Sequence, residues 1–116
     1  MTAPNDIALV DSVIAHARKA QVAFEAAGSQ ESYDQAAQAV GWAIMEPTRN
    51  RALAQLAVQT TGLGNVDDKI TKNHRKTLGL LRDIAEAKTY GIISDDPTTG
   101  VTEIARPIGV VGAVVP

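Results

Sequence analysis

Two adjacent carboxylates, Asp95 and Asp96, are the residues in this sequence that come nearest to an acid–base pair. Paired carboxylates can act as general acid and general base when their environments separate their pKa values. Here the pair opens the segment Asp-Asp-Pro-Thr-Thr-Gly at positions 95–100, which is dense in turn residues. Neighbouring side chains in a turn point in different directions, so we interpret the pair as part of a solvated turn.

A cluster of basic residues could attract a phosphate group. Its members lie within one segment of helical periodicity: Lys69, Lys72, His74, Arg75 and Lys76. Asp67 and Asp68 balance part of the charge, and no acid or nucleophile is identifiable beside His74. We favour a solvated helix face over a phosphate site.

Two glycines and the absence of cysteine bear on the remaining site chemistry. Gly62 and Gly64 precede a helix, but no strand comes before them and no third glycine follows at the required place, so the dinucleotide-binding fingerprint is not met. The sequence has no cysteine, which excludes disulfides, thiolate metal sites and a cysteine nucleophile. The residues by themselves therefore indicate no catalytic residue and no metal site.

Bulk composition limits the class of partner. The chain has 116 residues, 45% hydrophobic and 21% charged, with a net charge of −2. Nucleic acid is not an expected partner, because phosphate binding along a strand needs a concentrated basic surface. No apolar run approaches the roughly 20 residues of a membrane span, and the N-terminus lacks the features of a secretory signal. We expect a cytoplasmic protein without a membrane partner.

Residues 1–88 have the periodicity of four helices. We predict that Asn5 or Asp6 caps the first helix and Gly28 ends it, that Pro47 breaks or kinks the run after the second, and that Asn65 caps the fourth. The expected inner faces, in order, are Ile7, Val10, Ile14, Ala17 and Phe24; Tyr33, Ala37, Val40 and Ile44; Leu53, Leu56 and Ala57; and Val66, Ile70, Leu81 and Ile84.

The rest of the chain is typical of β structure. Residues 89–94 and 101–106 predict a hairpin around the turn at 95–100. Residues 109–115 are apolar and rich in β-branched side chains, and Pro107 and Pro116 flank them. Such a run is typical of a strand buried on both faces of a parallel sheet. Taken alone, the chain is therefore expected to be α+β, with four helices, a hairpin and one further strand.

Three segments of the sequence resemble the CoA-acylating aldehyde dehydrogenases. Residues 61–74 (Thr-Gly-Leu-Gly-Asn-Val-Asp-Asp-Lys-Ile-Thr-Lys-Asn-His) resemble a Thr-Gly-Met-Gly…Asp-Lys…Lys-Asn-His segment of that group, which includes acetaldehyde, propionaldehyde and sulfoacetaldehyde dehydrogenases. Residues 91–97 and 103–111 fit the same group in order and spacing. The resemblance covers nearly the whole chain and implies the N-terminal part of such an enzyme.

The resemblance implies an α/β fold of the aldehyde dehydrogenase type. Residues 1–88 would be the helical part that packs on the nucleotide-binding domain, and residues 89–107 the arm through which subunits pair into a homo-oligomer. Residues 108–116 would be the first strand of a Rossmann-like nucleotide-binding core. Val114, Val115 and Pro116 inherit a cofactor-binding role, because in the family this strand end lies along NAD or NADP.

The implied reaction converts a short aldehyde, NAD(P)+ and coenzyme A to acyl-CoA and NAD(P)H. In the family a cysteine thiolate attacks the aldehyde, and an asparagine helps to hold the oxyanion. The asparagine would follow Pro116 within a few residues and the cysteine much later. The 116-residue chain is therefore expected to be inactive by itself.

A second hypothesis needs no catalytic role. The chain could be a helical interaction module that docks a partner by adding its apolar residues 109–115 to the edge of a sheet. This hypothesis explains the solitary strand, but it does not explain why the whole chain resembles a dehydrogenase N-terminus.

Overall fold

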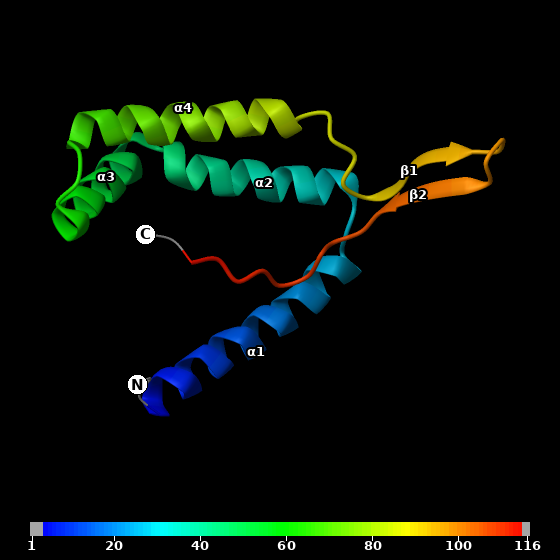
Figure 1. The fold of residues 1–116 in the computed structure, drawn as a ribbon, viewed down its shortest axis with the longest axis horizontal. Coiled ribbons are helices and arrows are strands. Elements are labelled where there is room, and N and C mark those ends of the chain that lie inside the picture. Colours follow the sequence, from blue (N-terminus) through cyan, green and yellow to red (C-terminus); the bar gives the residue numbers. More distant parts are fainter. Residues whose placement is uncertain (1–3, 115–116) are drawn as a thin grey trace. The chain divides into compact units, whose positions relative to one another are not determined.

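The computed structural model describes residues 4–114, which form two compact units. One unit consists of residues 4–30 and 88–114, and the other of Glu31–Ala87. The element order is α1 (Pro4–Ala26), α2 (Gln30–Met45), α3 (Pro47–Thr61), α4 (Val66–Ile84), β1 (Gly91–Asp96) and β2 (Val101–Ala105), as Figure 1 labels them.

Proline sets the boundary between α2 and α3. Pro47 occupies the first turn of α3, where its missing N–H costs nothing. Glu46 is the N-cap: its carboxylate accepts hydrogen bonds from the backbone N–H of Thr48 at 3.0 Å and of Arg49 at 2.9 Å. Gly62 ends α3 in the left-handed conformation, with φ +67°. The predicted break at Pro47 is confirmed.

The Glu46 cap predicts an acid-sensitive helix start. Hydrogen bonds from the Thr48 and Arg49 backbone lower the pKa of Glu46 below its ordinary value of 4.5. Because the folded-state pKa is the lower one, this stabilisation is present above about pH 4.5 and is lost as pH falls through the folded-state pKa. We expect Glu46→Gln to lower the thermal midpoint at neutral pH, and the difference from the unaltered chain to vanish in acid. Glu86→Gln, at an exposed position beyond α4, is the control. It should change neither the thermal midpoint at neutral pH nor the response of that midpoint to acid.

Asn65 begins α4 as predicted. Its side-chain oxygen accepts from the Asp68 N–H at 2.8 Å, and Asp67 and Asp68 lie in the first turn, where carboxylates suit the positive end of the helix dipole. The helix ends at Ile84, four residues before the predicted limit near Lys88.

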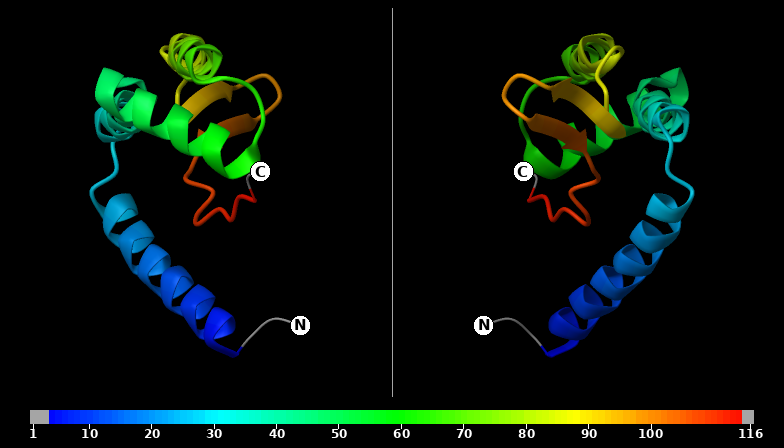
Figure 2. Two further views of the ribbon diagram at one scale, coloured as in Figure 1. Left: turned by 90° about the vertical axis from the view of Figure 1, so that its left-hand side faces the viewer. Right: turned by 90° about the vertical axis from the view of Figure 1, so that its right-hand side faces the viewer.

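In the second unit α2 and α4 run side by side in opposite directions, and α3 crosses them (Figures 1 and 2). Gly41 is buried in α2, and a Cβ added there would lie 2.6 Å from Leu81 Cδ1 of α4. The missing side chain thus permits close approach of the two helices. Between α3 and α4 the buried residues are Ala54, which is wholly covered, and Asn50, which is 2% exposed.

Several predicted inner residues lie at the surface. Leu53 and Leu56 of α3 and Val40 of α2 are exposed, whereas Tyr33, Ala37 and Ile44 are half-buried. The prediction failed for Leu53, Leu56 and Val40. The contacts between helices are made by small residues, Gly41 and Ala54, and not by these larger ones. Large apolar side chains beside those close contacts then face outward.

Helix α1 begins at Pro4, so Asn5 and Asp6 lie inside its first turn and neither is its cap; that prediction was wrong. It ends at Ala26, before Gly28 as predicted. The inner face expected for this helix is wrong too: Ile7, Val10, Ile14 and Phe24 are exposed, and Ala17 is half-buried. No other helix of its own unit covers it, so an apolar stripe alone did not identify a buried face.

The predicted hairpin is confirmed. β1 and β2 are antiparallel, with Ile92 opposite Ile104 and a bulge between Ile92 and Ser94. Lys88 Nζ donates to the carbonyl oxygen of Ile93 in that bulge, at 3.2 Å. Before β1, the Gln30 side chain donates to Thr89 Oγ1 and accepts from the Thr89 N–H, which ties this loop to the start of α2.

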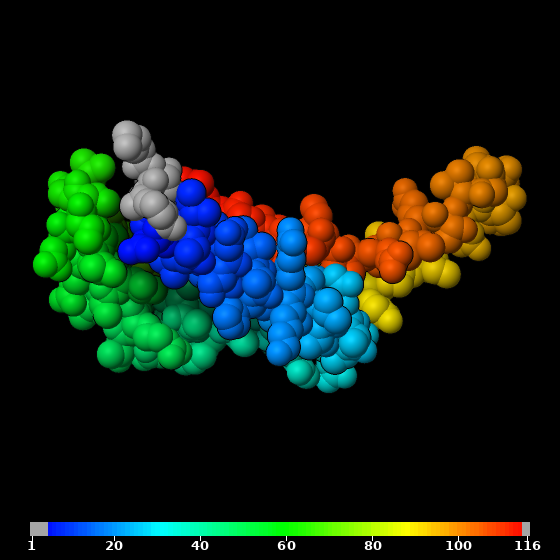
Figure 3. Space-filling model, turned by 90° about the horizontal axis from the view of Figure 1, so that it is seen from below, coloured from blue at the N-terminus to red at the C-terminus, as the bar shows by residue number. Residues whose placement is uncertain are grey.

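The strand predicted at residues 109–115 is absent over its described part, 109–114. These residues have an irregular backbone and lie beside α1; Figure 3 shows the segment in red and α1 in blue. Gly109 has φ +101°, outside the extended region. A strand also needs a neighbour to pair its backbone groups, and the described residues supply none to this segment.

No helix among residues 4–114 is both long and apolar enough to cross a membrane.

Candidate functional site

The three residues expected to line a cofactor lie at the C-terminal end of the chain. Val114 is fully exposed, and Val115 and Pro116 lie outside the described residues. A shallow hollow lies nearby, between α1 and the irregular segment. It is lined by Ala17, Ala20, Gln21, Phe24, Gly109, Val110 and Val111. Among these described residues Gln21 has the one polar side chain, and its amide donates to Glu25 Oε1 at 2.7 Å. The hollow therefore offers apolar contact but no charge.

The carboxylate pair at the hairpin serves the turn. Asp96 accepts from the hydroxyl of Thr99 at 2.7 Å and from the Thr98 N–H at 2.8 Å, and these bonds, the Thr99 bond first, lower the pKa of Asp96. Asp95 accepts from the Thr102 hydroxyl of β2 at 2.7 Å. The two residues end β1, which extends two residues past the predicted limit at residue 94, and the carboxylates of both accept hydrogen bonds within the hairpin. This supports a structural role over acid–base work.

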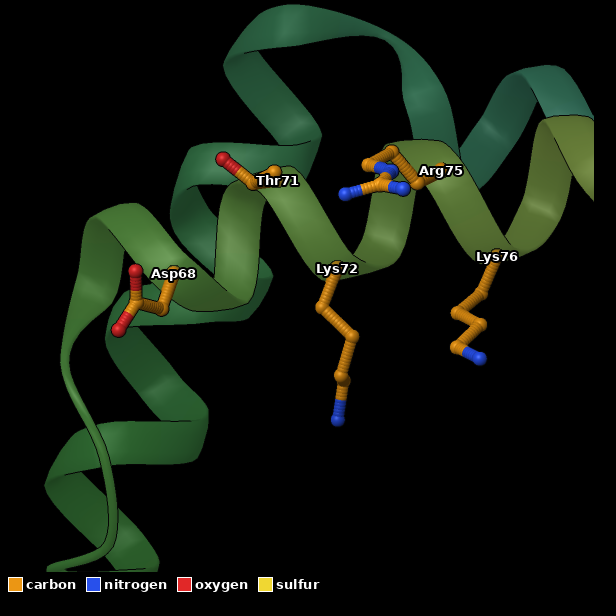
Figure 4. A pocket seen from close by; sticks show the side chains of 5 residues that line it. All are labelled: Asp68, Thr71, Lys72, Arg75 and Lys76. Atoms are coloured by element: carbon orange, nitrogen blue, oxygen red, sulfur yellow. The ribbon is translucent and has the colours of Figure 1, made fainter.

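The basic cluster predicted on the fourth helix lies on α4. Asp68, Thr71, Lys72, Arg75 and Lys76 line an open hollow along this helix (Figure 4). Lys72 and Lys76 extend from the helix in the same direction, while the Arg75 guanidinium turns back toward Thr71 (Figure 4). His74 is exposed and does not line the hollow, and Lys69 is half-buried near Gly64.

A buried amide pair was not predicted. Asn50 Nδ2 donates to the Ile70 carbonyl oxygen at 3.0 Å, and Asn50 Oδ1 accepts from Asn73 Nδ2 at 2.9 Å. The sequence carried a signal, because Asn50 and Ala54 are four residues apart and share one helix face. Asn73, in the Lys-Asn-His stretch, thus helps to join α3 to α4.

Among residues 4–114 no group of three or more histidine, cysteine, aspartate or glutamate side chains is arranged to hold a metal ion.

Comparison with known proteins identifies similar sequences among dehydrogenases. Over 107 residues, 92% of this chain, it is 60% identical to a sulfoacetaldehyde dehydrogenase (acylating) from Cupriavidus necator. It is 44% identical over 100 residues, 86% of this chain, to a sulfoacetaldehyde dehydrogenase (acylating) from Bilophila wadsworthia. It is 32% identical over 114 residues, 98% of this chain, to the bifunctional aldehyde-alcohol dehydrogenase of Escherichia coli.

The chain spans only part of these relatives, namely 22%, 21% and 12% of their respective lengths. No protein-family model matches the chain. No solved structure matches it significantly.

Proposed function

We infer that this chain corresponds to an N-terminal part of a CoA-acylating aldehyde dehydrogenase. From that premise we propose that it belongs to an enzyme that forms acyl-CoA from an aldehyde. The observation that carries the proposal is the 60% identity over 92% of the chain to an acylating dehydrogenase. This similarity along most of the chain favours the enzyme over the interaction module.

We further propose sulfoacetaldehyde as the substrate and sulfoacetyl-CoA as the product. Two relatives, at 60% and 44% identity, carry that activity in their names, whereas a succinate-semialdehyde dehydrogenase (acetylating) from Clostridium kluyveri is 34% identical. The reaction would take NAD(P)+ as hydride acceptor and coenzyme A as acyl acceptor.

The described residues do not by themselves fit NAD(P). Val114 is fully exposed, and the hollow beside α1 has no charged side chain for the cofactor's diphosphate. We therefore assign no step of hydride transfer to residues 4–114. Their proposed contribution is structural: residues 1–88 would pack on the nucleotide-binding domain, and residues 108–116 would become its first strand once neighbouring strands pair with them.

The hairpin within residues 89–107 is proposed to pair subunits. Ile92 and Ile104 face each other across the strands and are 61% and 59% exposed. A two-stranded hairpin is only marginally stable in water alone, so an apolar pair of this kind gains from a covering partner. The cytoplasmic location expected from the N-terminal sequence stays a prediction.

The test is an assay of the whole enzyme that carries this sequence. With sulfoacetaldehyde, NAD(P)+ and coenzyme A, we expect sustained NAD(P)H formation and one sulfoacetyl-CoA per hydride transferred. Replacing sulfoacetaldehyde with acetaldehyde should lower kcat/KM by at least about tenfold, because a site that pairs a charged group loses that contact. Without coenzyme A, we expect at most a burst of about one equivalent per active site, since no thiol accepts the acyl group.

The 116-residue chain is the control and should give no turnover, because it has no cysteine. Continued NAD(P)H formation without coenzyme A, with a free acid as product, would refute the acylating reaction. A higher kcat/KM for acetaldehyde would refute only the substrate.

A further inference from the structure

One face of α4 concentrates positive charge. Lys72, Arg75 and Lys76 line its hollow together with Thr71, and Asp68 lies at one end; we name these five residues the α4 basic face (Figure 4). All five side chains come from three successive turns of one helix. The arrangement therefore depends only on α4 itself, whose start is fixed by the Asn65 cap.

The three cations have no ion-pair partner within residues 4–114. The ion pairs of Arg49 with Glu46 and of Arg82 with Asp83 do not involve them. The Asp68 carboxylate accepts from the Asn65 side chain at the helix start. Each pair of like charges three or four residues apart destabilises a helix by about 0.2–0.5 kcal/mol. The face thus carries charge that α4 leaves unneutralised.

The dimensions and chemistry of this face suit a phosphate. Lys72 and Lys76 are separated by about 6 Å along the helix axis, so that both ammonium groups can approach one compact anion. Arginine can bind phosphate through two parallel hydrogen bonds, lysines add point charges, and a threonine hydroxyl adds a donor. A phosphate monoester carries nearly two negative charges at pH 7, so it should bind better than a diphosphate bridge, whose charges are spread over two groups.

We propose that the α4 basic face binds a terminal phosphate monoester of a small ligand. Coenzyme A and NADP both carry such a group, and naming them as sources rests on the proposed function. The site itself rests only on the residues of α4.

The experiment is a titration of the isotope-labelled 116-residue chain, followed through its backbone amide NMR signals. The probes are inorganic phosphate, coenzyme A, dephospho-coenzyme A, pantetheine, NADP and NAD. We expect saturable shifts centred on residues 68–76, with coenzyme A and NADP each binding at least about fivefold tighter than the counterpart without the monoester. Pantetheine should not bind. The ratio of the coenzyme A and NADP constants distinguishes the two sources.

The variant K72Q/R75Q/K76Q should weaken phosphate binding by at least about tenfold. The control R18Q/K19Q/R51Q removes the same charge from α1 and α3 and should leave binding within about twofold. Helicity measured by circular dichroism should be the same for both variants. An equal loss in the control, shifts outside residues 68–76, or no saturation by a chain that retains its helicity would overturn the proposal. These results do not depend on the enzyme assay, so failure of the proposed reaction would be seen separately.

Discussion

At pH 7 the Asn50→Asp variant should lose about 3 kcal/mol of free energy of unfolding, because it places an unpaired charge between α3 and α4. Asn50 is 2% exposed, and its amide donates to the Ile70 carbonyl oxygen while accepting from Asn73. Aspartate has nearly the same shape and keeps the acceptor. An ionised carboxylate has no donor, however, so one of its oxygens would face the Ile70 carbonyl oxygen with no proton between them.

The loss should depend on pH in a defined direction. Burial disfavours the charged form, so the pKa of Asp at position 50 in the folded variant should lie above the unfolded value of about 3.9. A group with a raised folded-state pKa supports folding below its unfolded pKa and loses that support as pH rises through the folded-state pKa. Once protonated, the carboxyl can donate to Ile70 as the amide does, and the deficit should shrink.

Urea unfolding followed by circular dichroism at about pH 4 and about pH 7 measures this effect. The matched control is Asn5→Asp, at an exposed position in the first turn of α1, which should change the free energy of unfolding by less than about 0.5 kcal/mol. Equal stability of the Asn50→Asp variant and the unaltered chain at pH 7, or a deficit that persists in acid, would show that the amide pair does not hold the two helices.

The second large effect is expected at Gly41. Gly41→Val should destabilise the α2–α4 contact by about 1–3 kcal/mol, the usual cost of overpacking. A Cβ at this position would lie 2.6 Å from Leu81 Cδ1 and 3.2 Å from Leu81 Cγ, so Leu81 or the helices must shift. The fluorescence of the single tryptophan, Trp42, reports unfolding from the adjacent position.

Two comparisons isolate the steric cause. Gly79→Val makes the same change in α4, where nothing lies within 4 Å of the added Cβ, and it should alter stability by less than about 0.5 kcal/mol. In a Leu81→Ala background, Gly41→Val should cost less than it does alone, since the clashing atoms are gone. Additive losses from Gly41→Val and Leu81→Ala would contradict the proposed contact.

Local signals in the sequence predicted the element order well. The cap at Asn65, the break at Pro47 and the hairpin around residues 95–100 depend on nearby residues, and all three are confirmed. The faces of α1 and α3 were not predicted correctly. Periodicity identifies an apolar stripe but not whether anything covers it. Gly41 and Ala54 make the close contacts, whereas Val40, Leu53 and Leu56 were expected to make them.

The site was predictable only in part. The basic residues of α4 were identified, yet their periodicity could not show that Lys72, Arg75 and Lys76 share one hollow without His74. The cofactor role of Val114, Val115 and Pro116 stays a prediction, because it depends on strands that would pair with residues 108–116. A strand needs backbone partners outside its own residues, so residues 109–114 could not form the strand alone.

The bonds that set the hairpin's register also bear on the order in which the protein folds. Ser94 donates to Glu103, Thr102 to Asp95 and Thr99 to Asp96, which are separations of nine, seven and three residues. Closing such short loops costs little entropy, and hairpins form in about 1–10 μs. We therefore expect the hairpin to reach its register early and, because two strands alone are only marginally stable, to open and close rapidly. On the proposed role of the hairpin, the rate of subunit pairing would then be set by the encounter between chains and not by rearrangement of the hairpin.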